Sequence, residues 1–205
     1  EAKGPDLSPI SLMHSTKVGL AGVIFAQSTF DIMHFQFTEE HLMIQQAARD
    51  FAQTELLPGV IERDDHQKFP AEGIRKMGEL GLMGMMVSPE YHGSGMDTIS
   101  YVLAMEEISK IDASASVCMS VNNSLVCWGL EKFGTPEQKE KYLKRLATGE
   151  IIGAFCLSEP EAGSDATSQK TTAIDMGDHY LLNGTKNWIT NGNSASVYLV
   201  IAQTD

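Results

Sequence analysis

The residues best suited to binding a polar ligand lie in the last third of the 205-residue chain, in residues 158–165 (Ser-Glu-Pro-Glu-Ala-Gly-Ser-Asp). This segment directly follows an apolar run, which predicts a loop at the end of a strand. Gly163 allows a close approach of the backbone, and the hydroxyls of Ser158 and Ser164 with nearby amides would line a concavity. Such a concavity suits a phosphate or a polar ring edge, although an ordinary strand-to-loop exit explains the same composition.

A second segment, residues 187–192 (Asn-Trp-Ile-Thr-Asn-Gly), places an aromatic ring beside a hydroxyl. Trp188 could flank a planar ligand while Thr190 hydrogen-bonds to it. The structural alternative is a core tryptophan that precedes a turn. The residue types alone leave both interpretations open.

Other catalytic signatures are missing from the sequence. It contains no phosphate-binding Walker loop, no G-x-S-x-G and no H-E-x-x-H. The six histidines have no metal-ligand spacing, so no metal site is predicted. Glu106 and Glu107 are adjacent, and adjacent residues of a helix point in different directions, which argues against a cooperating acid pair.

Composition excludes several classes of protein. The formal net charge of −12 and a pI near 4.8 argue against non-specific binding to nucleic acid or to anionic membranes. The apolar fraction of 42% is typical of a globular chain. The longest early apolar run, residues 18–26, is too short to span a membrane. Three cysteines without a paired spacing are expected to be reduced and mostly buried, in a reducing compartment.

Helices are expected to occupy residues 38–150. Thr38 is a good N-cap, but His41 stands where a capping box needs Glu or Gln, so we expect an incomplete box. Pro58 should divide the first helix. A second helix is expected from Pro70 to Leu80, with Gly81 as its end.

Four further helical or loop features precede the strands. Residues 84–97 read as a loop and residues 99–108 as a third helix. Residues 113–133 are small and apolar nearly all round, which predicts a helix buried on every side. Residues 135–138 (Thr-Pro-Glu-Gln) predict a complete capping box for a helix that ends near Gly149.

The period then changes to that of strands. Residues 151–157 and 197–202 each read as a buried strand. Residues 180–182 and 186–190 are expected to form a hairpin around a type I′ turn at Asn183-Gly184. The fold class is therefore α+β and multidomain, with an all-α domain followed by the start of a β-barrel-like domain. We assign residues 33–150 and 151–205 to these two domains and leave residues 1–32 as an unassigned N-terminal extension, with Met33 as a candidate natural start.

The two ligand-binding candidates resemble the two signatures of the acyl-CoA dehydrogenase family. Residues 155–165 are similar to its first signature, and residues 188–192 (Trp-Ile-Thr-Asn-Gly) match its second. Further landmarks of the family occur in order in the helical part, at residues 37–40, 81–84, 89–95 and 133–139. The resemblance covers residues 35–205.

The resemblance implies N-terminal helices, a middle β domain and a C-terminal four-helix domain, with FAD between the last two. Leu157 and Ser158 would contact the flavin ring, and Trp188 would flank it with Ile189 beside it. Thr190 would hydrogen-bond near flavin N5. Gly163 and Ser164 would face the pyrophosphate, with Ser164 also on the CoA side. The implied cofactor-binding residues are Phe155, Leu157, Ser158, Gly163, Ser164, Trp188, Ile189 and Thr190.

The family reaction is α,β-dehydrogenation of an acyl-CoA thioester, with electrons passed to electron-transfer flavoprotein. In the family the catalytic carboxylate lies in the C-terminal helices, so we assign no catalytic residue in this sequence and expect an inactive N-terminal part. The resemblance also implies a homotetramer for the full-length form. The expected compartment is the bacterial cytoplasm or the mitochondrial matrix.

Two alternatives stay open at this point. The first is a related acyl-CoA oxidase or flavin monooxygenase, which shares these domains but uses O₂. The second is a catalytically inactive helical domain with unpaired strand edges, which would be poorly soluble. A short-chain or short-branched acyl-CoA is the preferred substrate class, from the general resemblance.

Overall fold

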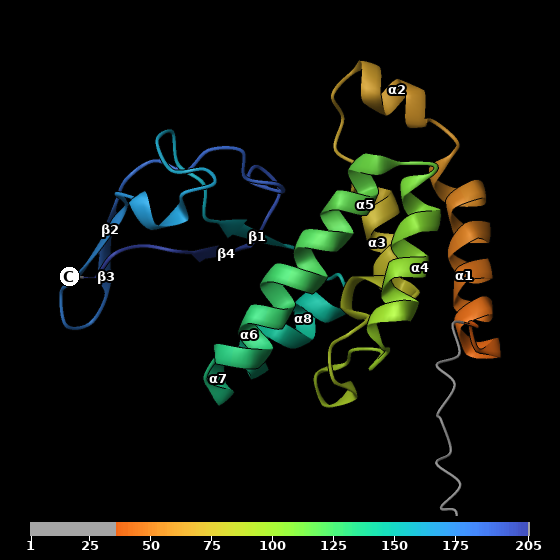
Figure 1. Ribbon diagram of the computed structural model, residues 1–205, viewed down its shortest axis with the longest axis horizontal. Coiled ribbons are helices and arrows are strands. Elements are labelled where there is room, and N and C mark those ends of the chain that lie inside the picture. The colour runs from red at the N-terminus through yellow and green to blue at the C-terminus, as the bar shows by residue number, and fades with distance from the viewer. Residues whose placement is uncertain (1–35, 205) are drawn as a thin grey trace, which may run out of the picture. The chain divides into compact units, whose positions relative to one another are not determined.

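The computed structural model describes residues 36–204, so the expectations for residues 1–32 lie outside the described part of the chain. Eight α-helices come first among the described residues: α1 (Glu39–Phe51), α2 (Val60–Asp65), α3 (Ala71–Glu79), α4 (Thr98–Ser109), α5 (Ala113–Ser120), α6 (Trp128–Phe133), α7 (Pro136–Gln138) and α8 (Lys144–Ala147). They are followed by β1 (Gly153–Cys156), β2 (Thr172–Asp175), β3 (Tyr180–Asn183) and β4 (Val197–Val200). This order of helices and then strands confirms the α+β class (Figure 1).

Short turns of other helix types extend or connect these elements. Turns of π-helix follow α1 at Ala52–Leu56, join α5 to α6 at Val121–Cys127 and join α7 to α8 at Lys139–Leu143. Turns of 3₁₀-helix occupy Leu82–Gly84, Pro89–Tyr91 and Ala166–Ser168. Residues 113–133 thus form one continuous helical rod, as the sequence predicts.

The start of α1 corrects one expectation. The Oγ1 atom of Thr38 accepts the amide of His41, and Nδ1 of His41 accepts the amide of Thr38, both at 3.2 Å. The capping box is therefore complete, because an imidazole nitrogen accepts the hydrogen bond that a glutamate would accept. The other ring nitrogen of His41 lies 3.0 Å from a carboxylate oxygen of Asp97, the N-cap of α4, which joins the starts of the two helices.

Other helix ends lie where the sequence predicts them. The helix that includes α1 ends before Pro58, and α2 begins after Gly59 in the left-handed conformation (φ +77°). Pro70 precedes α3, and Gly81 follows it with φ +76°. Thr135 opens α7 with the complete capping box that the sequence predicts.

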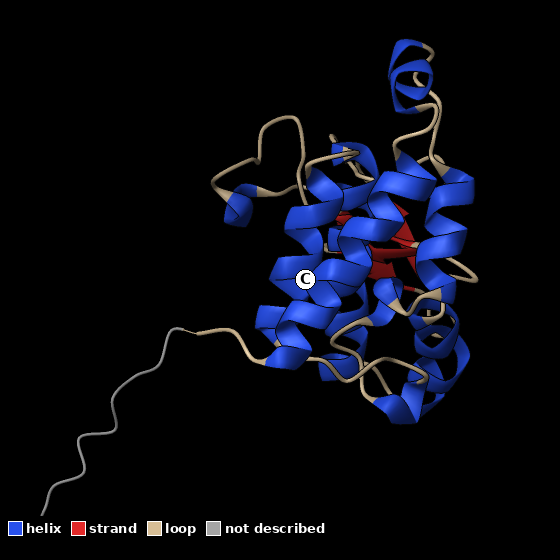
Figure 2. Ribbon diagram, turned by 90° about the vertical axis from the view of Figure 1, so that its right-hand side faces the viewer, coloured by secondary structure: helices blue, strands red, loops and turns tan. Residues whose placement is uncertain are grey.

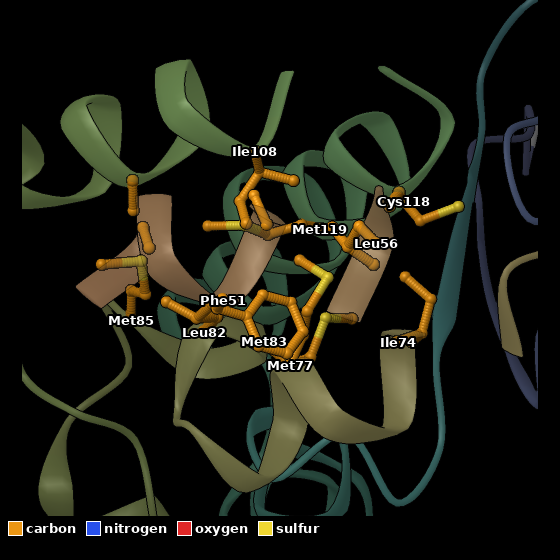
Figure 3. Packing of buried hydrophobic residues seen from close by; sticks show 14 of the residues in the cluster. Phe51, Leu56, Ile74, Met77, Leu82, Met83, Met85, Ile108, Cys118 and Met119 are labelled. Atoms are coloured by element: carbon orange, nitrogen blue, oxygen red, sulfur yellow. The ribbon is translucent and has the colours of Figure 1, made fainter. Parts of the chain in front are cut away.

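The main core lies between α1, α3, α4 and the rod. Phe51, Leu82 and Met83 meet there, as Figure 3 shows, with Ile108 and Met119 from the α4 and α5 side. All five side chains are buried. A smaller apolar cluster lies between the end of the rod and the segment from α7 to α8.

The helical rod is not buried all round, which corrects the prediction for residues 113–133. Val117 is 47% exposed, Trp128 51% and Phe133 77%. The rod packs against α4, the Leu82–Gly84 turn and β1. No described element covers the opposite face, so the apolar residues on it remain at the surface.

A buried asparagine in the rod connects three separate segments. The Asn122 amide group donates to the carbonyls of Met83, at 2.9 Å, and Leu146, at 3.0 Å. Its oxygen accepts the amide of Gly153, the first residue of β1, at 3.0 Å. Asn122 is completely buried and fully hydrogen-bonded, so it fixes where the first strand leaves the helical part.

Two strand pairs follow the helices. Strands β1 and β4 pair in parallel, with Gly153 opposite Val197. Strands β2 and β3 pair antiparallel, with Thr172 opposite Asn183. In Figure 1 the strands lie to one side of the helices, and Figure 2 views the same arrangement with the helices in front.

The predicted hairpin between residues 180–182 and 186–190 is wrong. Strand β3 pairs with the preceding β2, and residues 186–190 form no strand. In the turn between β2 and β3, the Met176 amide donates a hydrogen bond to the His179 carbonyl at 2.9 Å, and Gly177 has φ +95°. Gly184 serves a close approach instead: a Cβ atom there would lie 2.3 Å from Oγ1 of Thr171.

Replacing Asn122 by alanine tests the junction between helices and strands. Asn122→Ala leaves the buried Met83 carbonyl and the buried Gly153 amide without partners, while the Leu146 carbonyl keeps the amide of Gly149. We therefore expect the free energy of unfolding to fall by about 3 kcal/mol. Urea unfolding of the full chain, followed by circular dichroism at 222 nm, measures the change. The exposed Asn193→Ala is the control, for which we expect a change within about 0.5 kcal/mol. Equal stability of the two variants would contradict the role of Asn122.

Candidate functional site

The two signature segments lie side by side. Residues 157–165 leave the end of β1, and the amide of Asn187 donates to the carbonyl of Ser158 at 2.9 Å. From there the second segment runs back along β1, because the Asn191 side-chain amide donates to the Gly153 carbonyl at 2.9 Å. Positions about thirty residues apart in the sequence thus lie next to each other, beside β1.

A buried ion pair joins the same two segments. Nζ of Lys186 lies 2.7 Å from Oε1 of Glu159, and the two side chains are 11% and 4% exposed. The ammonium also donates to the Leu157 carbonyl, at 2.9 Å, and to the Gln169 side-chain oxygen, at 3.1 Å. The carboxylate of Glu159 in turn accepts the backbone amides of Lys170 and Thr171.

This environment changes the acidity of the carboxylate. The amide of Lys170 and the ammonium of Lys186, with Thr171, lower the pKa of Glu159 from 4.5 to about 2. Glu159 is therefore ionised at neutral pH. It serves as a fixed hydrogen-bond acceptor, since a carboxylate of such low pKa is a poor proton acceptor at that pH.

The hydroxyls predicted to bind a ligand are free to do so. Within residues 36–204, the side-chain oxygens of Ser158, Ser164 and Thr190 have no hydrogen-bond partner. Ser158 and Thr190 are half-buried, and Ser164 is exposed in the loop beyond the tight turn that joins Glu159 to Ala162.

The tryptophan of the second segment is at the surface. Trp188 is 94% exposed and has φ +59°, the left-handed region that large side chains rarely adopt. Such a conformation costs about 1 kcal/mol or more and clusters at ligand sites. The alternative of a core tryptophan is therefore wrong: this indole is available to a planar ligand.

Of the remaining predicted site residues, Gly163 and Ile189 are accessible to a ligand, while Phe155 and Leu157 contribute backbone atoms. Gly163 is exposed, and a Cβ atom there would meet no atom within 4 Å, so the loop is open for a ligand. Ile189 is half-buried at the rim of a cleft. The side chain of Phe155, by contrast, packs against the smaller apolar cluster of the helical part, so only its backbone is left to face the site. Leu157 contributes its carbonyl to Lys186.

The cleft beside Ile189 has a volume of about 700 Å³. The ion pair of Arg63 with Asp112, at 2.9 Å, forms part of its wall. Asn191 also lines it with φ +66°, and its buried Oδ1 has no hydrogen-bond partner among the described residues. The cleft lies between α2, the start of α5 and the turn after Thr190; its lining includes Val60, Ile61, Phe69, Pro70, Ser114 and Cys118.

Residues outside the predicted set organise the site. Lys186 and Gln169 were not identified from the sequence, and Glu159 and Asn191 were noted only as members of the two segments, without a role. A lysine and a glutamate 27 residues apart look like ordinary surface charges. The available signal was the position of each charge next to a predicted ligand-binding segment.

The neighbouring acids Glu106 and Glu107 do not form a pair. Glu107 is buried and accepts two hydrogen bonds from the Arg49 guanidinium, each of 3.0 Å, and one from Lys110. These partners lower the pKa of Glu107 to about 2, with the Arg49 hydrogen bond as the main cause. The Glu106 side chain is more than half exposed. The expectation that the two point in different directions is confirmed.

Two negative findings apply to the described residues. No helix within residues 36–204 is long and apolar enough to cross a membrane. The same part of the chain holds no group of three His, Cys, Asp or Glu side chains that could bind a metal ion.

The chain belongs to the acyl-CoA dehydrogenase family. Residues 38–150 match the profile of the acyl-CoA dehydrogenase N-terminal domain, and residues 154–205 match that of the middle domain. The resemblance based on the two signatures is thereby confirmed. The helical part is the N-terminal domain fold, and the strands are the start of the middle β domain.

Individual relatives support the same assignment. The short-chain specific acyl-CoA dehydrogenase of Clostridium acetobutylicum is 44% identical over 173 residues, which are 84% of this chain and 46% of that protein. A chain in the structure reported for the electron transferring flavoprotein of Acidaminococcus fermentans has a TM-score of 0.81 and 47% identity, over 84% of this chain and 46% of that one.

A solved acyl-CoA dehydrogenase complexed with FAD, from Bacillus anthracis, has a TM-score of 0.78 and 38% identity. The match covers 83% of this chain and 30% of that one. The chain therefore spans less than half the length of the relatives it matches.

The acidity of Glu159 gives a direct test of the ion pair. Its carboxyl group should titrate with a midpoint about 2 in place of the ordinary 4.5. A folded-state pKa below the unfolded one means that the stabilisation is complete above about pH 4.5 and disappears as the pH falls toward 2. Carbon-13 NMR of labelled glutamate measures the midpoint, and the resonance is assigned by its absence in Glu159→Gln. A midpoint near 4.5 would show that the pair does not form.

Proposed function

We propose that this chain supplies the flavin-facing part of an FAD-dependent acyl-CoA dehydrogenase, an enzyme that forms an α,β double bond in an acyl-CoA thioester. The observation that supports this most strongly is that the two signature segments lie side by side. The exposed indole of Trp188 and the free hydroxyls of Ser158 and Thr190 belong to segments joined by the Asn187–Ser158 hydrogen bond. The relatives' names and the complex of one of them with FAD point to the same cofactor and reaction.

The residues of the site fit the cofactor. An exposed aromatic face suits a planar ring, free hydroxyls suit its polar edge, and the open loop at Gly163 suits a phosphate group. FAD, when bound, accepts the hydride that leaves the β carbon of the acyl group. We assign contacts with it to Phe155, Leu157, Ser158, Gly163, Ser164, Trp188, Ile189 and Thr190, and a contact with CoA to Ser164.

The side chains have different tasks in this proposal. Trp188 covers one face of the ring and excludes water from it. The Thr190 hydroxyl would donate a hydrogen bond to the cofactor near its hydride-accepting atom, where negative charge would be stabilised. Ser158 would contact the ring through its hydroxyl and its backbone. Gly163 and Ser164 bind the pyrophosphate.

We further propose that the catalytic base comes from another part of the enzyme. The buried carboxylates of Glu107, Asp112 and Glu159 are each in an ion pair with a basic residue. The pKa values of Glu107 and Glu159, about 2, are too low for removing an α proton near neutral pH. The 205-residue chain by itself is then inactive, and its domain boundary lies near residue 150.

Partners and compartment follow the same reasoning. We propose a short-chain acyl-CoA as substrate, because the Clostridium relative is named short-chain specific. We propose electron-transfer flavoprotein as electron acceptor, because a matching chain occurs in a structure reported for an electron transferring flavoprotein. A homotetramer is the proposed assembly of the complete enzyme. The three free, buried thiols support a reducing compartment, the bacterial cytoplasm or the mitochondrial matrix.

A fusion protein tests the proposed function. The full 205-residue chain is joined to the part of the Clostridium relative that follows its matched segment. We expect this fusion to bind FAD and to dehydrogenate butyryl-CoA, with bleaching of the flavin under anaerobic conditions. Thr190→Val should lower the turnover number roughly tenfold, as loss of one hydrogen bond predicts, at unchanged flavin content.

The control for that variant is Thr185→Val, at an exposed threonine two residues before the second segment. We expect its turnover number to equal that of the unmodified fusion. A folded fusion that binds no FAD would refute the proposal. Rapid reoxidation of the bleached flavin by O₂ with peroxide release would instead identify an oxidase.

Gly163→Ala separates the fold from the cofactor site. No atom lies within 4 Å of the added methyl group, so the free energy of unfolding should change by less than about 0.5 kcal/mol. FAD affinity of the fusion should fall about tenfold, or about 1.4 kcal/mol, because the methyl group blocks the close approach of the pyrophosphate. Equilibrium dialysis and urea unfolding measure the two quantities. Unchanged affinity would exclude Gly163 from the site.

A further inference from the structure

The ammonium group of Lys186 is saturated by three acceptors. A lysine has three donors. Here they reach the carboxylate of Glu159, the carbonyl of Leu157 and the side-chain oxygen of Gln169, at 2.7, 2.9 and 3.1 Å. Since Lys186 is two residues before Trp188, one side chain connects the second signature segment to the first.

The carboxylate of Glu159 extends this connection to the far end of its own loop. It accepts the amides of Lys170 and Thr171, just before β2 begins at Thr172. The loop that carries Gly163 and Ser164 is therefore closed by the same carboxylate that neutralises Lys186. Both candidate ligand-binding segments depend on one pair of charges.

Regular strand pairing does not hold the second segment in place. Residues 186–190 belong to no strand, and a single backbone hydrogen bond, from Asn187 to Ser158, joins them to the end of β1. Trp188 follows at once with a left-handed backbone that is unfavourable by itself. Side chains hold this segment instead: the Lys186–Glu159 ion pair before Trp188 and the Asn191–Gly153 hydrogen bond after it.

A buried ion pair is an expensive way to stabilise a fold. Removing two charges from water offsets most of their attraction, and apolar side chains of similar size often give equal or greater stability. What apolar side chains cannot supply is the directed hydrogen bonding to Leu157, Lys170 and Thr171. The pair therefore provides position more than stability.

We propose that Lys186 and Glu159 are positioning residues for the flavin site, and that they set the placement of Ser158 relative to Trp188. The inference rests on the proposed function for the identity of the ligand. The placement itself is a property of the chain without any ligand. The two parts can therefore be tested separately.

Three variants of the chain and one control test the proposal. Lys186→Met leaves Glu159 buried without its charge partner. The double variant Glu159→Leu with Lys186→Met removes both charges and keeps the apolar volume. Lys186→Arg keeps the charge. Lys170→Met, whose exposed side chain lies in the same loop, is the control for loss of a positive charge.

Two readouts without flavin follow the placement. The first is hydrogen exchange of the Asn187 amide, which should accelerate roughly tenfold in Lys186→Met and in the double variant, as loss of one restraining hydrogen-bond network predicts. The second is the fluorescence anisotropy of Trp188, measured in a Trp128→Phe background because the chain has two tryptophans. It should fall in the same variants and stay unchanged in Lys170→Met.

Stability and FAD affinity then distinguish positioning from a merely structural role. The double variant should regain the urea midpoint of the unmodified chain, while the corresponding fusion binds FAD about tenfold more weakly. Lys186→Arg should restore part of that affinity. A double variant that regains the midpoint, the Asn187 protection and the FAD affinity together would overturn the proposal. If the unmodified fusion binds no FAD, the proposed function fails, and exchange and anisotropy still decide whether the pair positions the segments.

Discussion

The hydrogen bonds of one buried side chain, Asn122, determine where the strands begin. Its amide group joins the helical rod to Met83, to Leu146 and to the first residue of β1. The helical part therefore does more than supply an apolar core. It fixes the origin of the strand that ends at Ser158, since an unpaired amide or carbonyl at this depth would be costly.

A second polar network continues from the other end of that strand. Asn191 holds the start of β1 through the Gly153 carbonyl, and Lys186 holds its end through the Leu157 carbonyl. The second signature segment thus runs beside β1 between two fixed points without forming a strand. This arrangement leaves Trp188 exposed at the surface, and the Thr190 hydroxyl has no hydrogen-bond partner among the described residues.

Much of this could be predicted from the sequence, because it depends on local rules. Proline and glycine positions fixed the helix ends at Pro58 and Gly81, and the change of period separated helices from strands. The errors were non-local. Asn183-Gly184 was predicted to be the turn of a hairpin, but β3 pairs instead with the preceding β2, and the turn between them contains Gly177. The rod was predicted to be buried because composition does not reveal which neighbours a face has.

The candidate site shows the same division. The residue types of both segments, and their resemblance to the family signatures, identified Ser158, Trp188 and Thr190 as one site. The sequence did not identify Lys186, because pairing over 27 positions depends on the tertiary fold. Charged residues that look like surface residues can therefore hold a site together.

The hydrogen bond from the Asn187 amide to the Ser158 carbonyl can be observed directly by NMR. A scalar coupling across the hydrogen bond, between the nitrogen of Asn187 and the carbonyl carbon of Ser158, reports its formation in the chain without any ligand. We predict that this coupling is present in the unmodified chain and lost in Lys186→Met. Its absence from the unmodified, folded chain would contradict the joining of the two segments into one site.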